Sequence, residues 1–337
     1  MRPGGGARPS GGRTRGRGAT RVGRLLAVIV TVGLAVSMSA CASRAAEWTD
    51  GDHAVAGGGA DGVYFAYGTS LAAELSASLG VSVVAEETAG SVDNLLRVDS
   101  GEALVGFAQG DAAADAVAGA GAFAEPLPIQ AVARLYDEYL HVVVRGGSDI
   151  HELADLAGRS VSLGAENSGV NVIAGRVLDA AGVDAASLHD RRLDLAESID
   201  ALERSEIDAF FWVGGIPTPG IATLSEEVPV RLLPIEQSWV DEVNRRHSDA
   251  YRSSDLPIGL YGLEESATTL AVPNYLVTSA STPPGVVRDV VAGLFDARTR
   301  IAQHVPTAAL LDRTQAIFTG PVPLHPGAVE YYRTQRD

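Results

Sequence analysis

Two short turns in the sequence could bind an anion through their backbone amides. Residues 90–92 (Gly-Ser-Val) and 168–170 (Ser-Gly-Val) each stand where a predicted strand ends and a predicted helix begins. The first N–H groups of a helix have no carbonyl partner within the helix, and the helix dipole adds about half a positive charge there. Glycine also lets a ligand approach the backbone closely. The pattern indicates two anion-binding turns; the alternative is that Ser91 and Ser168 only cap their own helices.

Three polar side chains near predicted strand ends suit a small ligand. Gln109 ends a strand, and its amide can donate and accept hydrogen bonds, as an amino acid or a hydroxy acid would require. A solvated strand end is the alternative for this residue. Arg134 and Arg145 could each hold a carboxylate with two parallel hydrogen bonds. For Arg145, close to a predicted crossing of the chain, a structural role is the stronger interpretation.

Residues 57–62 match the G-x-G-x-x-G pattern of dinucleotide-binding loops. They follow a strand-like segment and precede a predicted helix, and Glu86 and Glu87 stand near the position of a ribose-binding carboxylate. An enzyme that uses a dinucleotide is therefore one hypothesis. The alternative is a glycine-rich turn between a strand and a helix. The export signal described below favours this alternative, because an exported enzyme has no free pool of nicotinamide cofactor.

Other catalytic and metal-binding patterns are absent from the sequence. It has no G-x-S-x-G motif, no phosphate-binding P-loop and no two histidines spaced as H-x-x-x-H. With one cysteine it can form neither an internal disulfide nor a cysteine-based metal cluster. We therefore expect no catalytic residue, no metal and no cofactor.

The charge of the chain argues against nucleic acid as a partner. Its 337 residues include 26 basic and 42 acidic ones, all the basic ones arginine, for a net charge of −16. Seven arginines and no acid fall in residues 1–40, so the rest of the chain carries −23. A surface that binds phosphate groups needs net basic patches, which this composition does not favour.

The N-terminal segment has the pattern of an export signal. An arginine-rich stretch precedes an apolar run, residues 25–36, that is too short to span ~30 Å of hydrocarbon but has the length of a signal-peptide core. Residues 37–41 (Ser-Met-Ser-Ala-Cys) resemble a bacterial lipobox, in which Cys41 would become the lipidated N-terminus. An ordinary signal peptide with an incidental cysteine is the alternative. We expect residues 1–40 to be a signal peptide and residues 41–50 a lipid-anchored tether.

After this segment, short apolar runs alternate with helix-like stretches, which is typical of a sheet flanked by helices. Predicted strands and helices fall at residues 81–86, 103–108, 129–135, 139–144, 160–163, 207–213, 228–233, 269–272 and 275–278, and at 64–79, 169–181 and 284–303. Near 136–145 and 266–272 the chain is expected to cross between two lobes. The prediction is an α/β, two-lobed fold with a mainly parallel sheet in each lobe. Lobe 1 would comprise residues 51–138 and 268–337, and lobe 2 residues 139–267, with a ligand bound between them.

Six segments, in order, resemble the TAXI family, the extracytoplasmic solute receptors of one class of TRAP transporter. They are residues 62–68 (GVYFAYG), 88–95 (TAGSVDNL), 100–111 (SGEALVGFAQGD), 153–164 (LADLAGRSVSLG), 207–217 (IDAFFWVGGIP) and 322–332 (VPLHPGAVEYY). The resemblance covers residues 50–335 and implies a periplasmic-binding-protein-like fold of type II without enzymatic activity. Asp61 and Ala66 depart from the glycine and proline of the family pattern, and Val170 replaces its threonine, which removes a hydroxyl donor.

The resemblance implies ligand contacts at strand ends and helix starts in both lobes. The glycine turns would bind a carboxylate, and aromatic side chains would form walls. The candidate ligand-binding residues are Tyr64, Gly90, Ser91, Val92, Asn94, Gln109, Ser168, Gly169, Val170, Phe211, Gly214 and Tyr261.

The expected function is that of a lipid-anchored receptor on the outer face of the cytoplasmic membrane. It would capture a small organic anion or amino acid, either glutamate-like or a dicarboxylate, and deliver this ligand to TRAP membrane subunits. The receptor itself is expected to be a monomer. A binding module that reports to a membrane kinase and an exported dinucleotide-dependent enzyme are the alternatives. The sequence does not identify the ligand.

Overall fold

The computed structural model describes residues 1, 6, 48–49 and 51–335. The predicted signal peptide and tether fall almost wholly outside the described residues, and Cys41 lies outside them. Within the described part of the chain, no helix is long and apolar enough to cross a membrane. The account below concerns the compact unit that begins at Asp50.

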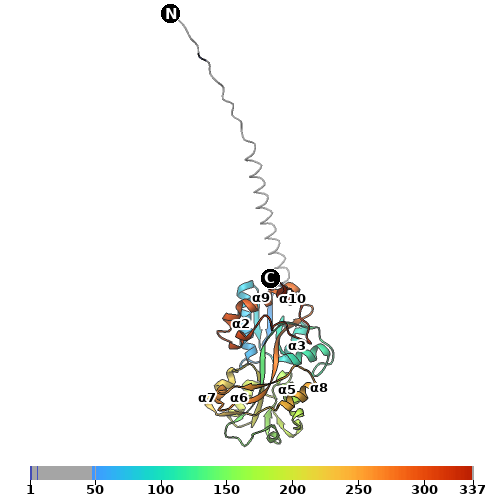
Figure 1. The fold of residues 1–337 in the computed structure, drawn as a ribbon, viewed down its shortest axis with the longest axis vertical. Helices are drawn as coiled ribbons and strands as arrows, with labels where there is room; N and C mark the ends of the chain where they lie inside the picture. Colours follow the sequence, from blue (N-terminus) through green and yellow to red (C-terminus); the bar gives the residue numbers. More distant parts are fainter. Residues whose placement is uncertain (2–5, 7–47, 50, 336–337) are drawn as a thin grey trace. The chain divides into compact units, whose positions relative to one another are not determined.

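A single mixed sheet runs through this unit (Figure 1). Its strands are β1 (Asp52–Ala56), β2 (Ser82–Glu86), β3 (Val105–Gln109), β4 (Ile129–Arg145), β5 (Ser160–Ser162), β6 (His189–Asp190), β7 (Ala209–Gly214), β8 (Val230–Leu232), β9 (Arg252–Leu256) and β10 (Ala267–Ser279). Their order is β2-β1-β3-β10-β4-β7-β5-β6, with β8 beside β4 and β9 beside β10. Pairs are parallel within β2-β1-β3 and β7-β5-β6, and antiparallel wherever β4 or β10 takes part.

The helices divide between two halves of the unit. They are α2 (Val63–Leu79), α3 (Ser91–Ser100), α4 (Gly110–Ala118), α5 (Gly169–Ala180), α6 (Leu195–Glu203), α7 (Pro219–Glu227), α8 (Gln237–Arg246), α9 (Pro284–Ile301) and α10 (Pro326–Thr334). Short 3₁₀ turns are η1 (Leu153–Leu156), η2 (Ala185–Ser187), η3 (Leu260–Gly262) and η4 (Pro306–Leu310). In Figure 1, α2, α3, α9 and α10 lie in one half, and α5 to α8 lie in the other.

Each half has its own apolar core. In the half with α3, buried Leu95 and Val277 belong to one cluster that packs on β1 and β3. The other half has two apolar clusters, and successive residues of β4 belong to different ones: Val142 packs in the first cluster and Val143 in the second. Because neighbouring strand residues point to opposite faces of a sheet, these clusters cover its two faces. The predicted α/β fold with two lobes is confirmed, whereas the lobe boundaries stay a prediction.

Two pairs of strands that were predicted separately are single long strands. Residues 129–135 and 139–144 are continuous in β4, and residues 269–272 and 275–278 are continuous in β10. Pro273 lacks an N–H group, yet it lies at a register shift in the pairing of the two strands, so the ladder shifts without ending. Since β4 and β10 run antiparallel to their neighbours, the sheet is mixed rather than mainly parallel.

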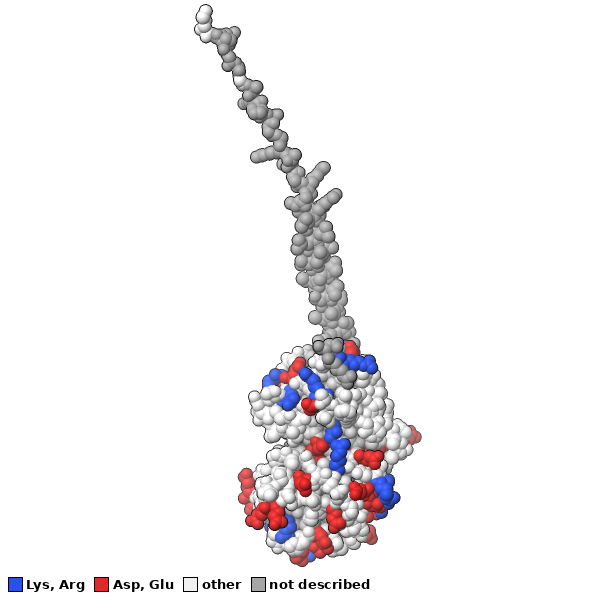
Figure 2. Space-filling model, viewed as in Figure 1, with Lys and Arg blue, Asp and Glu red and all other residues white. Residues whose placement is uncertain are grey.

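Charged side chains are spread over the surface of the unit. On the face shown in Figure 2, acidic side chains gather over the half with α5 to α8, with basic side chains interspersed. Some pair with each other, such as Arg300 with Glu74 and Arg245 with Glu242. Exposed ion pairs of this kind contribute roughly 0–1 kcal/mol each to the free energy of unfolding, so they add little to the stability of the unit.

A buried ion-pair cluster joins α4 to α5. Arg176 of α5 donates to Asp111 at 3.0 Å, to the Tyr251 hydroxyl at 2.7 Å and also to Asp115. Tyr251 in turn donates to Asp111 at 2.5 Å. All four side chains are buried. Burial raises the pKa of the Asp111 carboxyl and Arg176 opposes that rise, so Asp111 depends on Arg176 to stay ionised.

Arg176→Met should lower the free energy of unfolding by about 3–5 kcal/mol, because it leaves two buried carboxyl groups without their cation. Urea unfolding measures the change. Arg204→Met is the matched control, since Arg204 pairs with Asp200 on an exposed face of α6. That control should change the unfolding free energy by less than about 0.5 kcal/mol. Equal effects of the two substitutions would contradict a stabilising role for the buried cluster.

Candidate ligand-binding site

One cavity gathers the starts of four helices and the ends of two strands. It contains about 650 Å³ of space between atoms, part of it open to solvent. It lies where α2, α3, α5 and α6 begin and where β3 and β7 end, beside the middle of β4. Nine of the twelve predicted residues line it: Tyr64, Gly90, Ser91, Gln109, Ser168, Gly169, Val170, Phe211 and Gly214.

The two serine–glycine turns adjoin at this cavity. A Cβ atom placed on Gly90 would lie 3.6 Å from the Cβ atom of Ser168. The amide of Asp93, in the first turn of α3, donates to the carbonyl of Asn167 at 3.1 Å. Gly90 has a φ of 117°, a conformation that favours glycine. The N-termini of α3 and α5 therefore face the same space.

Ser168 serves as a helix cap, which was the alternative interpretation of its turn. Its Oγ accepts from the Asn171 amide at 3.1 Å and donates to the Ala165 carbonyl at 2.6 Å. The amides of Gly169 and Val170 occupy the first two positions of α5, where a helix supplies no carbonyl partner. The hydroxyl thus stabilises the helix, and the two amides are left for a ligand.

Gln109 brings an unused acceptor to the same place. Its side chain is 2% exposed, and its backbone amide donates to Ser91 Oγ at 3.1 Å. Its Oε1 has no hydrogen-bond partner among the described residues. A Cβ atom on Gly169 would overlap this oxygen and lie 2.9 Å from Ser91 Oγ, so a larger residue there would displace the Gln109 amide. An unpartnered buried amide oxygen costs roughly 1–3 kcal/mol, which a donor on a ligand would recover.

The sequence analysis missed Glu138, the buried acid of the cavity. It lies in β4, is fully buried, and its Oε2 accepts from the Tyr64 hydroxyl at 2.8 Å. Burial raises the pKa of the Glu138 carboxyl to about 8, although hydrogen bonds from Tyr64, Gln109 and Tyr136 lower it. The only signal in the sequence was an adjacent pair of acids, Asp137 and Glu138, which we interpreted as a gap between two strands.

Aromatic and aliphatic side chains form much of the remaining wall. The Tyr64 ring stacks on Phe107 with 5.3 Å between ring centroids, which fixes its hydroxyl toward Glu138. Trp212 donates from Nε1 to Thr218 Oγ1 at 3.1 Å. The apolar residues of the wall include Val63, Val170, Leu193, Leu195, Phe211 and Trp212. The cavity therefore combines a polar end with an apolar wall, as ligand sites usually do.

Comparison with known families matches residues 55–335, most of the chain, to the NMT1-like family. The chain belongs to the NMT1-like family. Its fold is similar to that of MatC from Rhodopseudomonas palustris with bound malate, at 15% identity and a TM-score of 0.53 over 85% of this chain and 96% of MatC. It is also similar to a binding protein of a phosphonate ABC transporter from Pseudomonas aeruginosa, at 11% identity and a TM-score of 0.53 over 77% and 79% of the two chains. At these identities the similarity shows a periplasmic-binding-protein-like fold.

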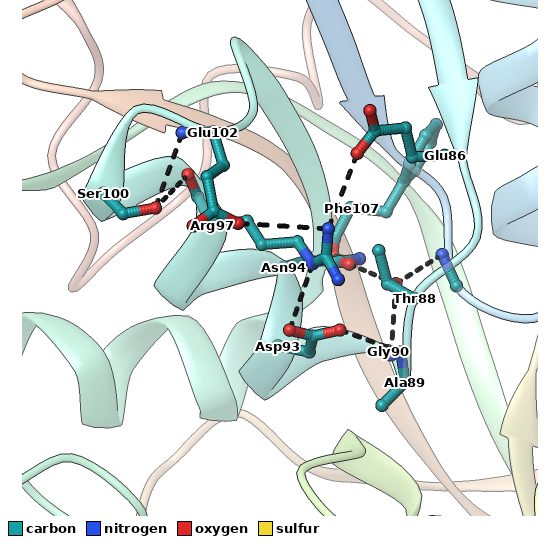
Figure 3. Close-up of polar contacts among 11 residues, drawn as sticks. Glu86, Thr88, Ala89, Gly90, Asp93, Asn94, Arg97, Ser100, Glu102 and Phe107 are labelled. Atoms are coloured by element: carbon teal, nitrogen blue, oxygen red, sulfur yellow. Dashed lines mark hydrogen bonds and ion pairs between the residues drawn. The ribbon is translucent and has the colours of Figure 1, made fainter.

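Three predicted residues of this NMT1-like protein do not line the cavity: Val92, Asn94 and Tyr261. Val92 belongs to the apolar core under α3. Asn94 donates to the Phe107 carbonyl at 2.8 Å and accepts from Thr88 Oγ1 at 2.5 Å, so it fastens α3 to β3 (Figure 3). The hydroxyl of Tyr261 accepts from the Thr218 amide at 2.7 Å. These side chains support the elements around the cavity.

The two arginines considered for a carboxylate grip lie elsewhere. Arg134 pairs with Asp137 at 2.6 Å. Arg145 donates to the carbonyls of Leu202 and Glu203 at the end of α6, which agrees with the structural interpretation. None of the residues that line the cavity is an arginine or a lysine. An anion there would be held by backbone amides and hydroxyl groups.

The glycine-rich loop at residues 57–62 uses its amides internally. Gly57 donates to the Glu86 carbonyl at 2.9 Å, Gly58 donates to Thr88 Oγ1 at 2.8 Å, and Gly62 donates to the Gly59 carbonyl at 3.0 Å. These amides are therefore not free to bind a pyrophosphate. The loop contributes glycines to the wall of the cavity, as a turn between β1 and α2.

Titratable side chains in the described part of the chain form no group that could hold a metal ion. His141, for example, is fully buried in β4, and burial lowers its pKa to about 4. Its ring packs against Tyr261 with 5.7 Å between centroids. This histidine is a neutral part of the core.

Glu138→Gln should stabilise the ligand-free protein, and the gain should grow with pH. The pKa of Glu138 is raised from 4.5 to about 8 on folding, so its contribution to stability is fully present below pH 4.5 and is lost as the pH rises toward 8. Relative to the wild type, the variant should gain about 1.4 kcal/mol of unfolding free energy per pH unit across this window. Urea unfolding at pH 5, 6, 7 and 8 measures it.

Asp194→Asn is the control for this series, because Asp194 lines the same cavity but is exposed. The comparison separates the loss of a buried carboxyl from the loss of an exposed one. A Glu138→Gln effect that is independent of pH would show that the carboxyl is not held in its neutral form by burial.

Proposed function

We propose that this protein is a solute-binding receptor that captures a small carboxylate-bearing ligand, an organic acid or an amino acid, in the cavity. The observation that carries the proposal is the buried, unpartnered Oε1 of Gln109, which lies against the N-terminus of α5 and beside that of α3. Two helix N-termini together offer free amides and about one positive charge, enough to balance one carboxylate. Membership of the NMT1-like family and the periplasmic-binding-protein-like fold support a binding role.

The proposed lobes are residues 51–138 with 268–337, and residues 139–267, hinged where β4 and β10 cross between them. Two observations support this division. The apolar clusters separate close to it, since only Leu270 and Val272 of the first lobe pack in the cluster of the second, and contacts cross it around the cavity, such as the hydrogen bond from Asp93 to Asn167 at 3.1 Å. Contacts of this kind would hold the lobes closed around a ligand and exclude water.

The proposed setting is outside the cytoplasmic membrane, with Cys41 lipidated and the receptor delivering its ligand as a monomer to TRAP membrane subunits. The resemblance of six segments to the TAXI receptors and the signal-like pattern of residues 1–40 support this setting. Proteins of this fold include one solved with bound malate and one from a phosphonate transporter. No catalytic step is part of the proposal.

Native mass spectrometry of the purified protein, before and after unfolding, is the first test. Tight receptors retain their ligand, so a released organic acid or amino acid is expected. A released dinucleotide would overturn the proposal. If the protein is empty, a thermal-shift panel of carboxylates and amino acids follows, in which a ligand at 100 times its Kd adds about 2.7 kcal/mol. No shift with any member of the panel would also overturn the proposal.

Gly169→Ala should weaken binding of the ligand so identified. The added methyl group would displace the Gln109 amide and press on Ser91 Oγ, which disturbs the polar end of the cavity. Gly175→Ala is the matched control, because Gly175 lies in the same helix with no atom within 4 Å of an added Cβ. It should leave affinity unchanged and stabilise the helix by about 1 kcal/mol. Isothermal titration calorimetry compares the two.

The double substitution Ser91→Ala with Gln109→Ala should lower the affinity for the ligand by at least about tenfold, since it removes a hydroxyl and an amide from the cavity. The same calorimetry measures this variant. Affinity equal to that of the wild type would show that the ligand binds somewhere else.

A further inference from the structure

The charges around the cavity are unusual for a site that is expected to bind an organic acid. No arginine or lysine lines it, so positive charge comes only from the N-termini of helices. The buried ionisable acid in its wall is Glu138. Asp194 also lines it but is exposed, and its carboxylate caps α6 by accepting from the Glu197 amide at 2.8 Å. The cavity thus has positive potential for one carboxylate and a buried ionisable acid beside it.

Two buried side-chain acceptors of the cavity, Gln109 and Glu138, lie together. The side chain of Gln109 hydrogen-bonds to Glu138, and its remaining Oε1 lies against Gly169 at the start of α5. An acceptor without a partner therefore stands between the anion-binding turns and the buried carboxyl. A ligand with a donor group next to its own carboxylate satisfies this acceptor and the carboxyl together. The ammonium group of an α-amino acid occupies that position relative to its carboxylate.

The remaining wall favours an apolar substituent on the ligand. Val170, Leu195, Phe211 and Trp212 line the cavity and offer no charged partner. A second acidic group on the ligand would meet either these side chains or Glu138, with no cation to balance it. Burying an unpaired charge in such surroundings is strongly unfavourable.

We propose that Glu138 is the residue that determines specificity, and that the cavity selects neutral α-amino acids with an apolar side chain. This inference rests on the proposed receptor function. The carboxylate of the ligand lies at the N-termini of α3 and α5, its ammonium group faces Gln109 Oε1 and Glu138, and its side chain packs on the apolar wall. Dicarboxylates and glutamate are disfavoured because their second carboxylate has no cation.

Matched probes test the inference by isothermal titration calorimetry on the purified protein after its bound ligand has been removed by unfolding and refolding. Each of three amino acids is paired with its 2-oxo acid, which has the same carbon skeleton but no ammonium group. The pairs are L-alanine with pyruvate, L-leucine with 4-methyl-2-oxopentanoate, and L-phenylalanine with phenylpyruvate. L-malate and L-glutamate complete the panel.

At least one neutral amino acid should bind the wild type about tenfold or more tightly than its 2-oxo acid, and more tightly than malate or glutamate. Glu138→Gln should reduce this preference to about threefold or less, because it removes the carboxyl group that ionises when an ammonium group lies against it. Asp200→Asn should keep the full preference, since Asp200 is exposed on α6 and does not line the cavity. Glu138→Gln is expected to fold, given its predicted gain in stability.

The other outcomes overturn the inference in distinguishable ways. Equal or tighter binding of a 2-oxo acid, malate or glutamate by the wild type would reject the ligand class while leaving the receptor function in place. If the preference for the amino acid persists in Glu138→Gln, Glu138 does not determine specificity, but the proposed ligand class stands. Binding of no probe would reject the inference, and the receptor function would then be judged by the mass spectrometry and the wider panel.

Discussion

The antiparallel pairing of β4 with β10 is the constraint on which the rest of this structure depends. These strands carry the sheet from one half of the molecule into the other, and each half adds its parallel strands at their sides. Their register shifts beside Pro273, and Glu138 lies next to this shift, opposite Val272. A carboxyl group placed there is enclosed by both halves, so the strand crossing that unites the fold also sets the polarity of the cavity.

The cavity is built at some cost to stability. Glu138 is buried with a raised pKa, and Gln109 keeps an acceptor without a partner. Other polar groups nearby have partners: Ser168 caps its helix, and Asn94 and Tyr261 bond to the backbone. A receptor whose ligand completes its unsatisfied groups gains affinity from the same atoms that destabilise it when empty.

The buried ion pairs lie on the helices that also form the cavity. α4 begins directly after Gln109, and it carries Asp111 and Asp115; α5 begins at Gly169 and carries Arg176. The contact between the two helices therefore buries these charges beside the turns that line the cavity. The ion pairs stand outside the cavity wall, so they hold the halves together without adding a cation to the ligand site.

The sequence by itself determined the local units of this protein. Apolar spacing predicted the helix that the structure has at Val63–Leu79, and glycine–serine turns after strands predicted where α3 and α5 begin. Nine of the twelve candidate residues line one cavity, because a strand, a turn and a helix start are encoded within about ten neighbouring residues.

Tertiary structure alone decided the continuity of β4 and β10 and the burial of Glu138. It also decided the pairing of Arg176 with acids more than sixty residues away. In each case the deciding partner is distant in the chain, so no local pattern could report whether an acid faces water or the inside of the protein.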